Sequence, residues 1–168
     1  MAAGDNKMGG FTLIELLVTL AVGVILLTVA VPSFQGLIAQ NRLEAEYYQV
    51  LSGFRFARSE ALKRREPVTA VMTPDGDGAG WRLEVKLDDG SGLGAIDCTS
   101  TADPNCLMVR NHEGAIPALT ITNSNVTFNA VGRLVSGGGN VQVDITHDGD
   151  TQQVCVELSG NVVGRSCA

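Results

Sequence analysis

Residues 11–31 read FTLIELLVTLAVGVILLTVAV, and this stretch decides the fold. The run is apolar apart from three threonines, one glycine and Glu15. Its length matches the roughly 20 residues that an α-helix needs to cross the hydrocarbon core of a bilayer. Glu15 is its only charge, and no charged residue occurs between Glu15 and Arg42. Because an unpaired carboxylate costs on the order of 2.5 kcal/mol in the middle of a membrane helix, and less toward its end, Glu15 is a candidate functional residue.

Two simpler explanations of the run fit less well. A cleaved secretory signal has an apolar region of only about 7–15 residues, followed by a small-residue cleavage site. Here the run is longer, and it ends at AVPS (residues 30–33), which lacks an A-x-A pattern. An ordinary signal-anchor helix would explain the length but not Glu15.

Residues 10–18, GFTLIELLV, resemble the class III signal of type IV pilins and type II secretion pseudopilins. The resemblance implies a leader at residues 1–10 that a prepilin peptidase removes between Gly10 and Phe11, followed by N-methylation of Phe11. It also implies that residues 11–31 cross the bacterial inner membrane, with the head in the periplasm, until an inner-membrane assembly platform moves the chain into a filament. There Glu15 would pair with the Phe11 ammonium of a neighbouring subunit, since both charges are costly when unpaired in apolar surroundings.

Residues 32–66 are predicted to continue the helix toward the head, with a kink expected at Pro32. Apolar side chains recur there at the three- and four-residue spacing of an amphipathic helix, at Tyr47, Val50, Leu51, Phe54, Ala57, Ala61 and Leu62. The helix is expected to end at RREP (residues 64–67), because cations suit a helix C-terminus and proline cannot continue the helix. Residues 57–64, ARSEALKR, resemble the GspH/FimT/FimU subgroup of minor pilins and pseudopilins.

Residues 67–168 are predicted to form a β-rich globular head, which gives the chain an α+β fold. Apolar and polar residues alternate in six short segments separated by Asp/Gly clusters, at residues 68–72, 81–87, 119–122, 126–128, 141–145 and 153–158. We therefore expect antiparallel strands, in one twisted sheet or two small ones, packed on the amphipathic face of the helix. Residues 80–81 and 128–133 also resemble the minor-pilin subgroup.

Four cysteines lie in the head, with spacings of eight and twelve that do not match the C-x₂-C pairs of zinc sites. A head exported into an oxidising compartment favours disulfides. Four cysteines allow three connectivities, of which local pairing, Cys98–Cys106 and Cys155–Cys167, is our prediction.

Other motifs point to no chemistry. Asp75 and Asp77 begin like a calcium loop, but Ala79 and Lys86 stand where an EF-hand needs ligands, so a solvated turn is favoured over a looser site with Asp88. Two isolated histidines, at positions 112 and 147, form no catalytic motif. We therefore predict no enzyme, no cofactor and no metal.

The charge distribution weighs against DNA as a partner. From residue 67 onward there are five basic and twelve acidic side chains, and such a head would mostly repel phosphates. FimT-like DNA-binding minor pilins resemble this chain but use a basic GRxR tail, of which only Arg165 remains in GRSC (residues 164–167). DNA binding would require Arg165 to meet Arg133 in one patch. The leading interpretation is a minor pilin that enters or primes a type IV pilus; the alternatives are a DNA-binding minor pilin and a GspH-like type II secretion pseudopilin.

Overall fold

The computed structural model describes residues 11–74, 80–87, 96, 98–99, 103–112, 120–122, 124–135, 139–147 and 149–167, apart from the side chains of residues 31–33 and 120–121. Its contacts divide the chain into two units, residues 1–38 and residues 39–168. The helix α1, Leu13–Arg64, contributes to both units.

The C-terminal end of α1 lies where the sequence predicts it. Arg65 adopts a left-handed backbone conformation with φ of 58°, and its N–H donates to the carbonyl of Ala61 at 2.9 Å. This geometry caps the last turn and satisfies one of its free carbonyls. In that turn Lys63 and Arg64 contact the buried Glu60 carboxylate at 3.2 and 2.9 Å. The hydrogen bond from Arg64 is the main cause that lowers the pKa of Glu60, against the opposing effect of burial.

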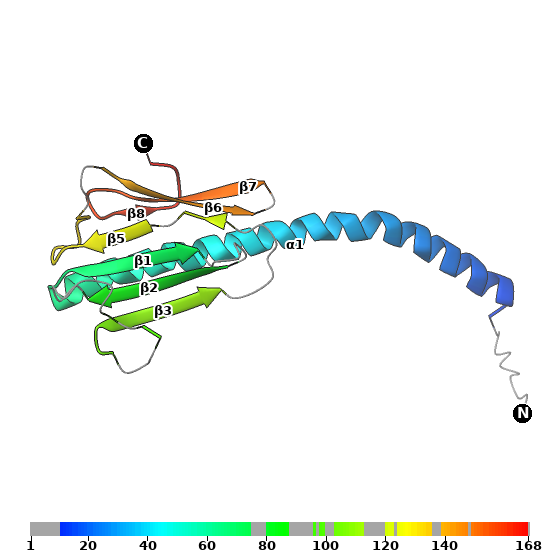
Figure 1. The fold of residues 1–168 in the computed structure, drawn as a ribbon. Helices are drawn as coiled ribbons and strands as arrows, with labels where there is room; N and C mark the ends of the chain where they lie inside the picture. The colour runs from blue at the N-terminus through cyan, green and yellow to red at the C-terminus, as the bar shows by residue number, and fades with distance from the viewer. Residues whose placement is uncertain are drawn as a thin grey trace, which may run out of the picture. The chain divides into compact units, whose positions relative to one another are not determined.

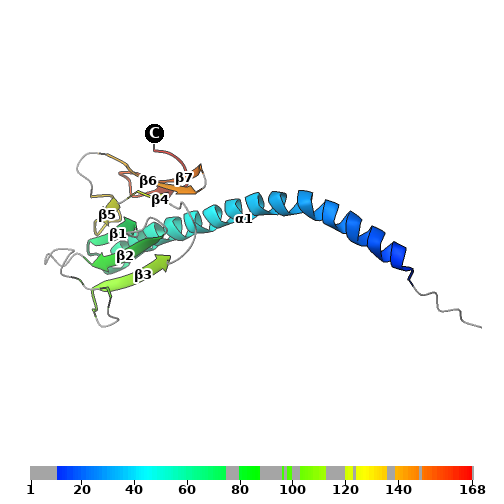
Figure 2. The same cartoon turned by 45° about the vertical axis from the view of Figure 1, so that its right-hand side comes forward.

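The described strands form two antiparallel four-stranded sheets. In the first sheet the order is β3-β2-β1-β5, with β1 at Val68–Pro74, β2 at Trp81–Leu87, β3 at Cys106–His112 and β5 at Ser124–Phe128. In the second sheet the order is β4-β6-β7-β8, with β4 at Thr120–Ile121, β6 at Val141–His147, β7 at Asp150–Val156 and β8 at Val162–Val163. Both sheets lie beside the part of α1 that belongs to residues 39–168 (Figures 1 and 2).

A single hydrophobic core joins α1 to both sheets. Six helical side chains are buried in it, namely Leu43, Val50, Leu51, Phe54, Ala57 and Ala61. Gly53 allows the helix to approach the first sheet closely, because a Cβ at this position would lie 2.1 Å from Leu83 Cδ2. Leu62, expected on the buried face, is instead 47% exposed. The predicted face is therefore confirmed except at its C-terminal end.

The α+β fold is confirmed, in the form of two small sheets. Two strands, β3 and β8, were not predicted. The β3 sequence CLMVRNH does not alternate apolar and polar residues, and β3 is an edge strand whose side chains are mostly half-buried. The two-residue β8, also an edge strand, is too short to carry a period. Periodicity detects strands with one buried face, so it does not detect either of these.

Candidate functional site: the N-terminal stem and the head

The first turn of α1 is capped by Thr12. The Thr12 carbonyl accepts the Leu16 N–H at 3.2 Å, and the Thr12 hydroxyl accepts the Glu15 N–H at 3.3 Å. Thr12 is thus the N-cap of the helix and Glu15 its third residue, the spacing of an S/T-x-x-E capping box. Sequence reasoning assigned Glu15 an intermolecular role and missed this local one, although the T-x-x-E pattern was visible.

The stem, which we define as residues 11–30, presents an apolar surface apart from Glu15 and three threonines. The large apolar side chains of Phe11 to Val29 are exposed, from 79% at Phe11 to 51% at Val22. The hydroxyls of Thr19 and Thr28 donate to the carbonyls of Leu16 and Ile25 at 2.9 and 2.7 Å, so they are satisfied inside the helix. Among the described helices, α1 contains a window long and apolar enough to cross a membrane, with a mean hydropathy of 2.6.

Glu15 therefore stands apart from the rest of the stem. Its carboxylate has no ion-pair partner among the described residues. Residues 11–38 of its own unit contain no lysine, arginine or histidine. A carboxylate in the first helical turn is favoured by the helix dipole, but only modestly. In apolar surroundings an ionised carboxylate without a positive partner is costly.

In the head, a buried carboxylate joins α1 to the first sheet. Glu46 on α1 is only 3% exposed, and its two oxygens lie 2.8 Å from Trp81 Nε1 and 3.0 Å from His112 Nδ1. The Arg110 guanidinium on β3 reaches the same helix at the Gln49 carbonyl, 3.2 Å away. These contacts place His112, isolated in the sequence, in a structural network. Sequence reasoning missed Glu46, because a charged residue on an amphipathic helix is usually exposed.

A second buried network holds the segment that carries the first disulfide. Cys98 and Cys106 are disulfide-bonded. Arg82 donates to the Cys98 carbonyl at 3.1 Å, and both Arg82 and Lys86 contact the Glu84 carboxylate. Burial raises the pKa of Glu84, but the hydrogen bonds and charges of Lys86 and Arg82 together outweigh it and lower that pKa.

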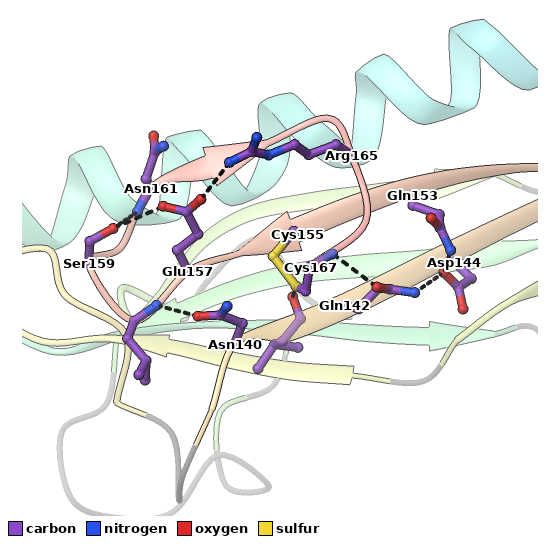
Figure 3. Close-up of a disulfide and its surroundings, with 12 residues drawn as sticks. Asn140, Gln142, Asp144, Gln153, Cys155, Glu157, Ser159, Asn161, Arg165 and Cys167 are labelled. Atoms are coloured by element: carbon purple, nitrogen blue, oxygen red, sulfur yellow. Dashed lines mark hydrogen bonds and ion pairs between the residues drawn. A yellow bond between two sulfur atoms is a disulfide. The ribbon is translucent and has the colours of Figure 1, made fainter.

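The second disulfide fastens the C-terminal tail to the second sheet (Figure 3). Cys155 of β7 is bonded to Cys167, whose backbone N–H donates to the Gln142 side chain at 3.1 Å. The tail also contacts α1, because a Cβ at Gly164 would overlap the Tyr47 hydroxyl at 1.4 Å. Both disulfides join the pairs of cysteines expected from the sequence.

The two arginines considered for DNA occupy different settings. Arg165 NH2 contacts the Glu157 carboxylate at 3.3 Å (Figure 3). Arg133 lies in a turn where its N–H donates to Asn129 Oδ1 at 2.9 Å. The shared patch of Arg133 and Arg165 that DNA binding would require stays a prediction.

No metal site is found in the described part of the chain, where no three His, Cys, Asp or Glu side chains group together. The calcium candidate of Asp75, Asp77 and Asp88 lies outside the described residues, as does Gly10. His147 is buried, and its Nδ1 has no hydrogen-bond partner among the described residues.

Comparisons with known proteins agree with this architecture. The family model "Type II transport protein GspH" matches residues 48–161, and the model "Prokaryotic N-terminal methylation motif" matches residues 5–31. Two fimbrial proteins of Pseudomonas aeruginosa are each 30% identical over 119 residues, which cover 68% of this chain and 77% of theirs.

Among solved structures, the type IV minor pilin FimU of P. aeruginosa (strain PAO1) has a similar fold. Its TM-score is 0.52 at 22% identity, with 76% of this chain and 90% of that chain covered. A long N-terminal helix followed by antiparallel sheets is thus shared with a known minor pilin. Since the GspH model covers more than half of the sequence, the chain belongs to the GspH family and is a type IV pilin-like minor pilin or pseudopilin, a structural subunit of a pilus-type filament.

Proposed function

We propose that this chain is a minor pilin of a type IV pilus and that it enters the filament through its stem. The observation that carries the proposal is an exposed apolar helix with a single carboxylate that has no partner within the described residues. Such a surface is stable only in a membrane or against other helices of the same kind. The fimbrial relatives favour the pilus over a type II secretion pseudopilus, to which the name of the family model refers.

The proposal divides the chain by task. Residues 1–10 form a leader that prepilin peptidase removes between Gly10 and Phe11, and Phe11 then receives the N-methyl group. Residues 11–31 cross the bacterial inner membrane and later form part of the filament core, while residues 32–66 continue the helix into the periplasmic head at residues 67–168. An inner-membrane assembly platform transfers the chain into the filament. The match of the N-terminal methylation model to residues 5–31 supports this division.

In the filament, Glu15 pairs with the Phe11 amino group of a neighbouring subunit. Removing one partner of such a buried pair leaves the other charge uncompensated, at a cost of about 3 kcal/mol or more, which is about a hundredfold in a docking equilibrium. The pair therefore favours one register of the stem among its neighbours. It does not affect insertion into the membrane, since an uncharged residue at position 15 is easier to insert.

The test compares three variants of the full chain in its host cell. Glu15→Gln removes the charge and keeps a side chain that suits a capping box; Thr12→Ala removes the cap and keeps the charge; Thr19→Val makes a neutral change in the stem. We expect all three in the membrane fraction at wild-type levels, but Glu15→Gln in sheared filaments at about a tenth of wild type or less. Wild-type incorporation of Glu15→Gln, or an equal loss with Thr12→Ala, would refute the ion pair.

Location separates the remaining alternatives. A type IV pilus subunit is recovered from sheared pili and its deletion reduces piliation, whereas a type II secretion pseudopilin is required for export of secreted enzymes. Loss of secretion with normal piliation after deletion would assign the chain to the secretion system. The ion pair of Arg165 with Glu157 disfavours phosphate binding by Arg165. We therefore expect no gel shift of duplex DNA at low salt. A shift abolished by Arg165→Ala would favour the DNA-binding alternative.

A further inference from the structure

A groove of about 510 Å³ lies in the head between α1 and the C-terminal turn. We call it the arginine groove; it is lined by Arg55, Arg58, Ser59, Leu62, Asn161 and Val162. Neither the assembly of the stem nor the hydrophobic core accounts for its polar lining.

Backbone carbonyls fix the two guanidiniums in this groove. Arg55 Nε and NH2 donate to the Val162 carbonyl at 3.4 and 3.2 Å, and Arg58 Nε donates to the Gly132 carbonyl at 3.1 Å. Each guanidinium has five N–H groups, so further donors remain on both. Because carbonyls are neutral, these bonds orient the arginines and leave their charges uncompensated.

Five other cations of the head are arranged differently, whereas Arg110 also donates to a backbone carbonyl, that of Gln49. Glu60, Glu84 and Glu157 each bind one or two nearby cations through their carboxylates, at Lys63, Arg64, Arg82, Lys86 and Arg165. Within the described part of the chain, neither Arg55 nor Arg58 has a carboxylate at ion-pair distance. Two oriented arginines without a counter-ion, side by side in a groove, are the chemistry that binds an anion.

The rest of the lining favours a carboxylate on a protein over a phosphate polymer. Leu62 is 47% exposed and lines the groove, so an aliphatic group next to the anion would be covered by it. The Asn161 side chain offers a further donor. A nucleic acid would bring many phosphates toward residues 39–168, which carry eleven basic and sixteen acidic side chains, whereas one acidic side chain brings a single charge.

We propose that the arginine groove binds an aspartate or glutamate side chain, flanked by an apolar residue, from an adjacent subunit of the filament. The partner's role as a filament subunit rests on the proposed function; the anion chemistry rests on Arg55 and Arg58 alone. The groove gives the head a specific contact in addition to the contact made by the stem.

The test is a titration of the full chain in micelles of a neutral detergent, followed by NMR at the arginine Nε–H resonances. One probe is the capped peptide acetyl-Leu-Glu-Leu-amide, and its matched control is acetyl-Leu-Gln-Leu-amide. The glutamate peptide is expected to shift the Arg55 and Arg58 resonances saturably, and the glutamine peptide is expected to leave them unchanged. Equal effects of the two peptides, or no effect of either, would overturn the proposal.

A pair of variants tests the location without breaking the backbone bonds of the arginines. Asn161→Asp places a negative charge at the groove, and Asn111→Asp makes the same change on the exposed surface of β3. We expect Asn161→Asp to lower the affinity for the glutamate peptide about fivefold, which corresponds to roughly 1 kcal/mol. Asn111→Asp is expected to leave this affinity unchanged. Equal affinities of the two variants would overturn the assignment of the site.

A short oligothymidine at physiological salt is the third probe. It is expected to shift the two arginines no more than the glutamine peptide does. If it displaces the glutamate peptide, the ligand class is a phosphate polymer and the proposal fails. Because all three probes act on the isolated chain, failure here leaves the Glu15 experiment in filaments as an independent result.

Discussion

Opening the Cys155–Cys167 disulfide should destabilise the head by an amount that follows from its loop. The bond closes a loop with a sequence separation of 12, and the Cys98–Cys106 bond closes one of 8. In the chain-entropy model, cross-linking a loop of that larger size lowers the entropy of the unfolded chain enough to contribute about 3 kcal/mol at 25 °C. Cys167→Ser removes this contribution and leaves Cys155 as a small buried thiol, which the apolar core accepts.

Other contacts of the tail bear on this loss of stability. The Cys167 N–H bond to Gln142 and the contact of Gly164 with Tyr47 hold the tail independently of the sulfur bond, so part of the tail stays in place in the variant. Since β8 has only two residues, its ladder adds little. For a unit the size of residues 39–168, a loss of about 3 kcal/mol corresponds to a decrease in Tm of about 10 °C.

Thermal unfolding of the full chain in detergent, followed by near-UV circular dichroism of the single tryptophan, measures this change. Trp81 is buried in the core, so its signal reports the packing of the head. A decrease below about 2 °C would refute the entropic argument, because the fold would then be insensitive to the loop. Peptide mapping without reduction is the control: it should recover Cys155–Cys167 and Cys98–Cys106, and a Cys98–Cys155 peptide would contradict the pairing.

Three further changes should have measurable effects on the stability of the head. Glu46→Ala leaves the buried Trp81 N–H without an acceptor and should cost about 2–3 kcal/mol in denaturant unfolding; a cost below about 0.5 kcal/mol would show that the bond contributes nothing. Arg65→Gly should stabilise the chain by about 0.5–1 kcal/mol, because glycine adopts the observed φ of 58° without strain, and a loss of stability would refute this account of the cap. Because the folded-state pKa of Glu84 is lowered from 4.5, its ionised carboxylate stabilises the fold above pH 4.5, and this stability is lost as the pH falls through the folded pKa. Glu84→Gln should reduce the loss of unfolding free energy at acid pH. An unchanged dependence of that free energy on pH would contradict the assignment.

The sequence predicted the parts of the fold that depend on local pattern. The GFTLIELLV stretch and the three- and four-residue spacing after it are properties of one helix, so they were readable along the chain. Two of the strands, β2 and β6, have one face toward the core and alternate over most of their length, whereas β1 and β7 each bury three consecutive residues. The division of these strands into two sheets was left open, because strand order depends on contacts between distant segments.

The polar networks were not predicted, for a related reason. Glu46 meets Trp81 and His112 across intervals of 35 and 66 residues, and no spacing rule connects such positions. The role of Arg55 and Arg58 also depends on carbonyls of the C-terminal half. Charged residues on an amphipathic helix appear as a solvated face until the partner elements are in place. By contrast, the two local disulfides could be predicted, since cysteines close in sequence can pair whatever the arrangement of the rest of the fold.

The mass of the N-terminal peptide of the chain recovered from filaments tests the central claim most directly. Filaments sheared from cells that express the untagged chain would be digested and analysed by mass spectrometry. The account predicts a peptide that begins at N-methylated Phe11 and continues through Thr12 and Glu15. The absence of the chain from the filament fraction, or a filament-borne chain that still begins at Met1, would contradict it.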